Sequence, residues 1–224
     1  MTVADQPASV RLVLASASPA RLETLRRAGV EPTVVVSTVD EDLAVAEARS
    51  RYGEVEPVDV ALLLARAKAE NVAGRGERAA LVLGCDSVLE IDGEVHGKPG
   101  SVSEATRRWR RMRGRSGVLH TGHWLVDDRP NGTGATLGAT ASTTVHFAQV
   151  SDAEIDAYVA TGEPLLVAGG FTIDGFGGPF VTAIEGDHHN VVGLSLPLLR
   201  DLLGQVEVAW FDVVGTVSGS SSQG

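Results

Sequence analysis

The chain has 224 residues, 43% of them hydrophobic, and a formal net charge of −10. That length and apolar content suffice for one large domain, or one domain with a lobe, around a full core. The acidic balance argues against generic nucleic-acid binding, and no apolar run approaches the ~20 residues of a membrane span. A single cysteine, Cys85, excludes an internal disulfide and a multi-cysteine metal site.

The predicted elements begin with a buried strand and a capped helix. Residues 12–15 form a short apolar run typical of a strand, and Ser18 followed by Pro19 marks a helix start. Ser16, Ser18 and Arg21 would then surround the free backbone N–H groups and the positive dipole end of that helix, which favour a phosphate group. An ordinary capped helix accounts for the same residues, and this stretch alone does not decide between the two.

Three carboxylates follow the next predicted strand, which covers residues 31–37. Asp40, Glu41 and Asp42 come directly after it, in the position where α/β sheets present side chains to ligands. The same residues can also cap a following segment, and for Asp42 we expect a capping role.

Lysine is rare in this chain, which has 17 arginines but only Lys68 and Lys98. Where arginine serves as the general surface cation, lysines are candidates for sites that need a compact ammonium, such as contacts with an oligophosphate. A count of two also fits chance. Lys68 lies beside the apolar face of a helix predicted over residues 57–74, from which it can snorkel to solvent or reach into a cleft. Lys98 follows a predicted hairpin, between Gly97 and Pro99.

Asp86 is a carboxylate embedded between two apolar runs. The sequence predicts a strand from Ala80 that meets Gly84-Cys85-Asp86-Ser87, and a second strand that reaches the Asp92–Gly93 turn. An unpaired charge in such surroundings would be costly, so Asp86 needs a cation, a metal ion or several hydrogen-bond donors. A structural ion pair is the alternative to a functional role.

A basic helix follows, in which Ser103 is the predicted cap and Gly114 the end. Six arginines lie between residues 107 and 115, and a solvated helix face explains them better than a nucleic-acid site does.

Two strands are predicted after that helix, over residues 118–126 and 139–150. His120, His123 and His146 lie on them. We expect these histidines on strand faces rather than on a metal, because no acid or cysteine stands at ligand spacing.

The last part of the chain combines a helix, a glycine-rich block and a closing helix. Residues 151–154 form a capping box, and six glycines fall between residues 169 and 186, which permits tight turns or close approach to a ligand. The closing helix is predicted over residues 194–203. Residues 1–9 and 217–224 are expected to be flexible tails, and the lack of a signal pattern in residues 1–9 predicts a cytoplasmic protein.

Six motifs in this order resemble those of the Maf family, the septum-formation-inhibitor-like nucleotide pyrophosphatases. Each motif alone is weak, but their sequence spans residues 10–203 and is specific. The motifs are Ser16-Ala-Ser18-Pro19-x-Arg21, Val39-Asp40-Glu41, Leu64-Ala-x-x-Lys68-Ala, Gly84-x-Asp86-Ser87, Gly97-Lys98-Pro99, and the late series Ala168-Gly-Gly-Phe, Gly186-Asp187 and Asn190-Val-Val-Gly193-Leu.

The resemblance implies a single α/β domain over residues 10–203, with an elongated, mixed, twisted β-sheet, flanking helices and two lobes around a cleft, similar to the inosine triphosphate pyrophosphatases. It implies hydrolysis of a nucleoside triphosphate, or of a modified nucleotide, to the monophosphate and pyrophosphate with a divalent metal cation, Mg²⁺ or Mn²⁺. The family's proton-accepting aspartate falls on Asp86 and its acidic metal-side residue on Glu41, and the two carboxylates together would hold the metal. The family's phosphate-binding cations fall on Arg21, Lys68 and Lys98. With the hydroxyl groups of Ser16 and Ser18, and with Asp174 near the base, they make up the predicted substrate contacts; for Asp174 a turn residue outside the base pocket is the alternative. A homodimer remains open.

Two departures from the family pattern affect these expectations. The usual Ser-Pro-Arg-Arg is here Ser18-Pro19-Ala20-Arg21, so one phosphate-side cation is missing. The Ile-Gln-Gly of many pyrimidine-selective members is here Ile173-Asp174-Gly175, and a carboxylate in place of an amide removes a hydrogen-bond donor. A preference for dTTP and UTP is therefore not carried over.

Two other classes of function are weighed against this enzyme. One is a regulator of cell division that senses a nucleoside triphosphate without cleaving it, and metal-dependent release of pyrophosphate separates the two. The other is a nucleic-acid partner that uses the arginine-rich helix, which would require retained affinity for oligonucleotides at moderate salt.

Overall fold

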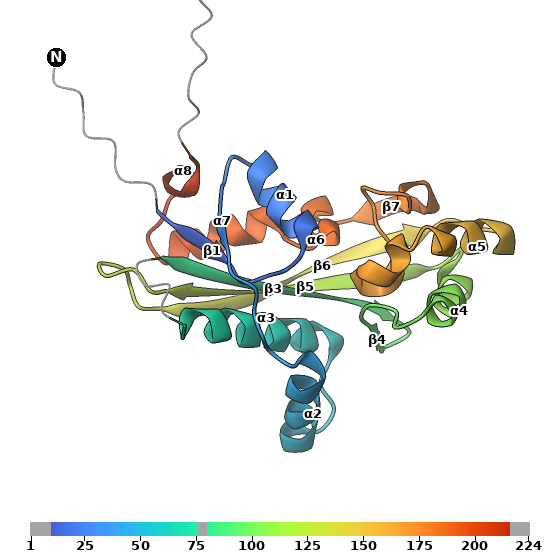
Figure 1. The fold of residues 1–224 in the computed structure, drawn as a ribbon, viewed down its shortest axis with the longest axis horizontal. Coiled ribbons are helices and arrows are strands. Elements are labelled where there is room, and N and C mark those ends of the chain that lie inside the picture. The colour runs from blue at the N-terminus through green and yellow to red at the C-terminus, as the bar shows by residue number, and fades with distance from the viewer. Residues whose placement is uncertain (1–9, 76–79, 216–224) are drawn as a thin grey trace, which may run out of the picture.

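The computed structural model describes residues 10–75 and 80–215. Within these ranges the chain forms a seven-stranded mixed sheet ordered β2-β1-β3-β5-β6-β7, with β4 paired to β3 outside that path (Figure 1). β1 runs parallel to β2 and to β3, and the remaining pairs are antiparallel. The strands are β1 Leu12–Leu14, β2 Thr33–Val34, β3 Leu81–Ile91, β4 Glu94–His96, β5 Ser116–Asp127, β6 Thr136–Phe147 and β7 Val181–Glu185.

Helices cover both faces of this sheet, which confirms the predicted α/β architecture. α3 lies along one face, α1, α6 and α7 lie on the other, α4 and α5 gather at the far end, and α2 projects away from the layers (Figure 1). The helices are α1 Pro19–Arg27, α2 Glu41–Tyr52, α3 Pro57–Ala73, α4 Val102–Met112, α5 Asp152–Ala160, α6 His188–Val192, α7 Leu196–Gln205 and α8 Trp210–Val213. Three short 3₁₀ turns are η1 Glu163–Leu166, η2 Ala168–Gly170 and η3 Gly178–Phe180.

Two separate apolar clusters divide the sheet along β3. The first half of β3, with Leu81 and Leu83, packs with α1 and α7, whereas Leu89 and Ile91 pack around Trp109 with α4 and α5. The Trp109 indole stands edge-on to three aromatic rings of that second cluster and donates a hydrogen bond of 2.8 Å to the Gly170 carbonyl. The chain therefore has two lobes that share the long strands.

An interruption in strand pairing marks the boundary between the lobes. β5 covers one edge of β3 from Leu81 to Glu90, while on the other edge β1 pairs with residues 81–83 and β4 with residues 89–91. Residues 84–88 thus have an edge that neither strand covers. Asp86 and Ser87 lie in this stretch, and because side chains alternate along a strand they project to opposite faces.

The structure corrects several expectations about element boundaries. β3 is one continuous strand through Asp86, where two strands were predicted. The Asp86 carboxylate can lie in the middle of a buried strand because Lys68 from α3 pairs with it. The strand predicted over residues 31–37 shrinks to the two residues of β2. Asp40, not Asp42, caps α2, and this helix was not predicted from the sequence. Likewise Ser101, not Ser103, caps α4.

Other local predictions are confirmed. Ser18 caps α1 with Pro19 at its first position, and Ser151 and Glu154 form the capping box of α5. The closing helix is α7, capped by Ser195. No helix in residues 10–75 or 80–215 is both long and apolar enough to cross a bilayer. The tails predicted at residues 1–9 and 217–224 lie outside the described residues.

Candidate active-site cleft

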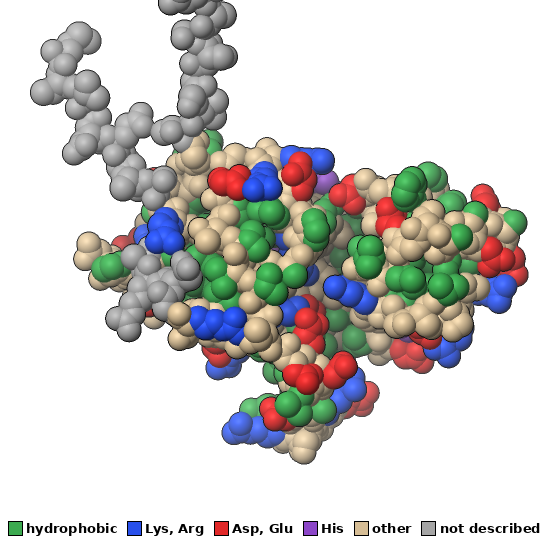
Figure 2. Space-filling model, in the orientation of Figure 1, with side chains coloured by type: hydrophobic (Ala, Val, Ile, Leu, Met, Phe, Trp, Pro, Cys, Tyr) green, Lys and Arg blue, Asp and Glu red, His purple; other side chains and the backbone are tan. Residues whose placement is uncertain are grey.

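A cavity of about 1070 Å³ opens between the two lobes, beside the uncovered edge of β3. Figure 2 shows the molecule hollowed there, with charged side chains of both signs along the hollow. Its walls come from the start of α1, the inner sides of α2 and α3, the middle of β3, the loop after β4, and the segment from η1 to residue 174. All the predicted site residues line it: Ser16, Ser18, Arg21, Glu41, Lys68, Asp86, Lys98 and Asp174.

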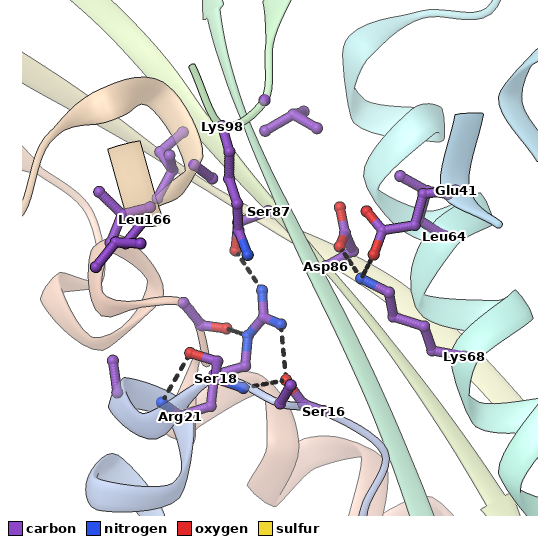
Figure 3. Close-up of a pocket in the computed structure, with 18 of the residues that line it drawn as sticks. Ser16, Ser18, Arg21, Glu41, Leu64, Lys68, Asp86, Ser87, Lys98 and Leu166 are labelled. Atoms are coloured by element: carbon purple, nitrogen blue, oxygen red, sulfur yellow. Dashed lines mark hydrogen bonds and ion pairs between the residues drawn. The ribbon is translucent and has the colours of Figure 1, made fainter. Parts of the chain in front are cut away.

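Two carboxylates converge on one ammonium group in this cleft. The Lys68 Nζ lies 2.8 Å from Glu41 Oε1 and also contacts Asp86 Oδ1 (Figure 3). The three residues come from the first turn of α2, the middle of α3 and the uncovered stretch of β3. Asp86 is 7% exposed, whereas the Glu41 side chain is about half exposed, so the cluster runs from the sheet toward solvent.

Burial dominates the acid–base behaviour of Asp86. It raises the pKa of this carboxyl, and the nearby charges of Lys68 and Arg21 oppose the shift without cancelling it. Among the described residues only Lys68 donates a hydrogen bond to the Asp86 carboxylate. Asp86 therefore keeps unused acceptor capacity and an increased proton affinity inside the cleft.

The donor set fits a hard divalent cation. Glu41 and Asp86 offer carboxylate oxygens from two different elements, and these oxygens already surround a common positive centre, the Lys68 ammonium. Carboxylate oxygen is the protein ligand that Mg²⁺ and similar ions prefer, usually from one or two side chains.

Arg21 is a buried connector as well as a positive charge. Its Nε donates to the Gly193 carbonyl at 2.7 Å, its Nη1 to Ser16 Oγ at 3.1 Å and its Nη2 to Ser87 Oγ at 3.0 Å (Figure 3). Its Nη1 also donates to the Cys85 carbonyl at 2.8 Å. These bonds tie α1 to β3 and to the end of α6, and they use most of the guanidinium donors. Arg21 thus places a fixed positive charge behind the cleft, while its predicted phosphate contact stays a prediction.

The two serines of the first motif also serve the local structure. Ser18 Oγ accepts from the Arg21 backbone N–H at 3.4 Å, and Ser16 Oγ accepts from the Ser18 N–H at 3.2 Å. Both hydroxyl groups can still donate a hydrogen bond toward the cleft.

Lys98 and Asp174 approach from the other lobe. Lys98 is exposed on the loop after β4, and its side chain extends into the cleft toward Ser87 and Arg21 (Figure 3). Asp174 is exposed and lines the same cleft. In Figure 3 Leu166 stands across the cleft from Lys68 and Glu41.

Three residues that organise the cleft were not predicted from the sequence. The Ser87 hydroxyl accepts a hydrogen bond from the Arg21 guanidinium and lies 2.9 Å from the Thr121 hydroxyl, to which it is also hydrogen-bonded. Its place in the Gly84-x-Asp86-Ser87 motif could have indicated a role in the site. Arg108 is 7% exposed and donates to the Gly97 carbonyl. Because five other arginines surround it in the sequence, its different role could not be predicted from the sequence. Glu163 accepts four hydrogen bonds in the cleft wall, and no pattern in the sequence pointed to it.

The arginine-rich helix α4 is largely neutralised by its neighbours. Arg111 pairs with Asp92 and Glu94, and Arg110 and Arg113 pair with Asp152. This pairing agrees with the predicted solvated face and leaves little of the positive surface that a nucleic-acid partner would require.

The predicted histidine positions are confirmed, since His120 and His123 lie on β5 and His146 on β6. His123 is buried, its Nε2 accepts from the Ser195 backbone N–H at 2.9 Å, and burial lowers its pKa to about 4. It is therefore a neutral structural acceptor at the start of α7.

Comparisons with known proteins agree with the family that the sequence motifs resemble. The Maf family model, described as Maf-like protein, matches residues 11–206. The chain is 55% identical over 207 residues to a nucleoside triphosphate pyrophosphatase of Leifsonia xyli subsp. xyli, covering 91% of this chain and 96% of that protein. It is 57% identical over 203 residues to one of Salinispora tropica, covering 89% and 85%. Among solved structures, the Staphylococcus aureus Ham1 protein aligns with a TM-score of 0.41 and 13% identity, over 88% of this chain and 90% of that one.

Proposed function

The chain belongs to the Maf family, and on that basis we propose that it is a nucleoside triphosphate pyrophosphatase, a hydrolase of acid anhydrides. It would cleave the bond between the α- and β-phosphates and release a nucleoside monophosphate and pyrophosphate. The observation that carries the proposal is the convergence of Glu41, Lys68 and Asp86 in a cleft that Lys98 also enters.

Charge is the main requirement of this chemistry. A triphosphate brings about four negative charges, and phosphoryl transfer depends mostly on positioning and on charge stabilisation. Lys68 and Lys98 would neutralise phosphate oxygens directly, and the buried Arg21 adds a positive charge behind them. A divalent cation held by Glu41 and Asp86 would supply the largest compensating charge when bound.

Asp86 is the proposed proton acceptor. Its raised pKa and its unused acceptor capacity suit a carboxylate that orients a water molecule and takes the proton as that water attacks. General-base assistance of this kind is typically worth 10²–10⁴-fold in rate. The proton of the attacking water goes to an Asp86 carboxylate oxygen as the water oxygen forms a new bond to phosphorus. On the opposite side of that phosphorus, the bond to the bridging oxygen between the α- and β-phosphates breaks.

A nucleotide panel tests the proposed function. Standard and modified nucleoside triphosphates are incubated with the purified protein, with Mg²⁺, with Mn²⁺ and with a chelator, and both products are quantified. Equal amounts of monophosphate and pyrophosphate, formed only with the metal present, are expected. Tight nucleotide binding without turnover in every metal condition would instead support a nucleotide-sensing regulator.

We further propose that Asp174 influences the choice of base. It is exposed and lines the cleft, and an ionised carboxylate accepts hydrogen bonds but cannot donate them. Cytosine and guanine offer amino and N–H donors, whereas thymine presents one N–H between two carbonyls. A mismatch of this kind costs about 1–3 kcal/mol, or roughly 5- to 150-fold in selectivity.

Asp174→Gln should therefore shift the substrate ranking toward dTTP and UTP. The ratio of kcat/KM values for dTTP, UTP, CTP and GTP is compared between the two forms. An unchanged ranking would show that Asp174 is a turn residue outside the base pocket.

A further inference from the structure

The carboxylate of Glu163 is the centre about which the loop of residues 172–177 closes. Its Oε1 accepts hydrogen bonds from the Tyr158 hydroxyl at 2.8 Å, the Thr172 hydroxyl at 2.6 Å and the Gly177 backbone N–H at 3.1 Å. Its Oε2 accepts from the Phe176 backbone N–H at 3.0 Å. One side chain at the start of η1 thus holds both ends of the loop.

The loop fits so closely around this carboxylate that two positions have no room for a side chain. A Cβ at Gly175 would lie 2.3 Å from Glu163 Oε2, and a Cβ at Gly177 would lie 2.5 Å from the Tyr158 hydroxyl oxygen. Part of the glycine density noted in the sequence therefore serves contact with Glu163 rather than contact with a ligand.

The loop connects the cleft to the core of the second lobe. Thr172, Ile173 and Asp174 line the cleft. On the opposite side Tyr158 is 3% exposed and its ring stands 5.3 Å from Trp109 in an edge-on contact. Apolar packing does little to stabilise the outer part of the loop, because the Phe176 side chain is 69% exposed.

Glu163 is ionised when it performs this role. Burial alone would raise its pKa, but hydrogen bonds from Thr172, Phe176, Tyr158 and Gly177 outweigh burial and lower the pKa. All four contacts need an acceptor, and an ionised carboxylate is the side chain that supplies only acceptors.

We propose that Glu163 is a positioning residue that fixes the cleft wall against the nucleoside part of the substrate, so that it controls KM rather than the chemical step. The inference rests on the proposed pyrophosphatase function. It assigns the wall of residues 172–174 to the nucleoside, because the cationic side chains Lys68, Lys98 and Arg21 account for the phosphate end.

Glu163→Gln tests this role with little change of shape. Whichever way the amide is turned, its NH₂ group faces at least one N–H or O–H donor of the loop, and that contact is lost. We expect the KM of the best nucleoside triphosphate to rise about tenfold, as for the loss of one hydrogen bond to a charged group, with kcat within about threefold of the wild type. The inhibition constant of inorganic tripolyphosphate, which has no nucleoside, should stay unchanged.

Two further variants separate positioning from damage to the lobe. Glu154→Gln removes an exposed carboxylate that likewise accepts a backbone N–H, in the capping box of α5, and it should leave KM unchanged. Tyr158→Phe keeps the ring but removes the hydroxyl that donates to Glu163 and accepts from the Thr172 backbone N–H at 3.3 Å, and it should raise KM in the same direction. This variant also serves if Glu163→Gln does not fold.

Three outcomes would overturn the proposal: a KM that does not move, a fall in kcat alone, or a parallel rise in the tripolyphosphate constant. Failure of the proposed function is distinguishable from these. If the wild type bound nucleotides without turning them over, the ratio of nucleotide to tripolyphosphate dissociation constants in the same variants would still decide the role of Glu163.

Discussion

Two buried aspartates on adjacent strands show how the same residue type serves structure in one region and the cleft in another. Asp86 is 7% exposed in the middle of β3, and Asp127 is 3% exposed at the end of β5. Asp127 accepts from Arg129 Nε at 2.7 Å and Nη2 at 2.9 Å, and from the Thr133 N–H at 2.7 Å and hydroxyl at 2.9 Å. Asp86 instead shares a single ammonium with Glu41.

The difference in partners produces opposite shifts in acidity. Hydrogen bonds from Arg129 outweigh burial and lower the pKa of Asp127, whereas burial outweighs the attraction of Lys68 and raises the pKa of Asp86. A carboxylate whose acceptors are filled by its own loop stabilises the fold. One that is buried with too few donors retains affinity for a proton or a cation, which is what a catalytic carboxylate needs.

The largest expected effect is on turnover when Asp86 is changed. Asp86→Asn keeps the shape but cannot accept a proton, so kcat should fall by at least ~100-fold while the fold is retained. Initial rates at saturating nucleotide, with circular dichroism as a check on folding, measure this. Near-normal turnover in the folded variant would exclude Asp86 as the proton acceptor.

Asp127→Asn should have the complementary effect. Removing the charge leaves the Arg129 guanidinium with the Val206 carbonyl but without a carboxylate, and the free energy of unfolding should fall by about 3 kcal/mol. Turnover per folded molecule should not change, because Asp127 lies at the turn between β5 and β6 and does not line the cleft. Urea unfolding together with activity at low temperature tests both statements. A large loss of kcat with unchanged stability would contradict the division between the two aspartates.

The two lysines proposed to contact the phosphates should give intermediate effects. Lys68→Ala and Lys98→Ala should each lower kcat/KM by about tenfold or more, the range for loss of a hydrogen bond between charged groups. Lys→Arg should restore little, because a planar fork does not replace a compact ammonium. Full recovery with arginine at both positions would mean that only generic charge matters there.

The matched control for the lysines is Arg107, which is exposed on α4 and pairs with Glu104. Arg108 is unsuitable, although the sequence places it on the same basic helix. It is buried and donates to the Gly97 carbonyl, so its removal would disturb the loop that carries Lys98.

The sequence alone predicted the parts of the site that depend on local chemistry. The Ser18–Pro19 helix start, the α5 capping box, and the presence of Asp86 and the two lysines in one cleft all follow from short patterns or from the family motifs. The continuity of β3 could not be read in this way. A charge in the middle of a strand becomes tolerable only when α3 brings Lys68 to it, and that contact joins residues distant in sequence.

The same limit explains the residues that were missed. Glu163 is effective because Tyr158, Thr172 and Gly177 are brought around it, and Arg108 because its helix packs beside the Gly97 carbonyl. Neither contact has a spacing or a composition that distinguishes it from an ordinary surface charge. The helix α2 was missed because its sequence has almost no apolar periodicity and it buries only Ala48.

The smallest expected effect is the pH dependence of the stabilisation that Asp127 provides. The pKa of Asp127 is lower in the folded than in the unfolded chain, so its stabilisation is complete above the ordinary value of ~3.9 and is lost as the pH falls toward the folded value. Between pH 5 and pH 3 the difference in unfolding free energy between wild type and Asp127→Asn should shrink by about 1 kcal/mol, because the slope approaches about 1.4 kcal/mol per pH unit only below the unfolded pKa. Urea titrations from pH 5 to pH 3 measure the difference, and the other carboxyl groups cancel from it because both proteins contain them. A constant difference across this range would mean that the charge of Asp127 contributes nothing and that only the shape of its hydrogen bonds does.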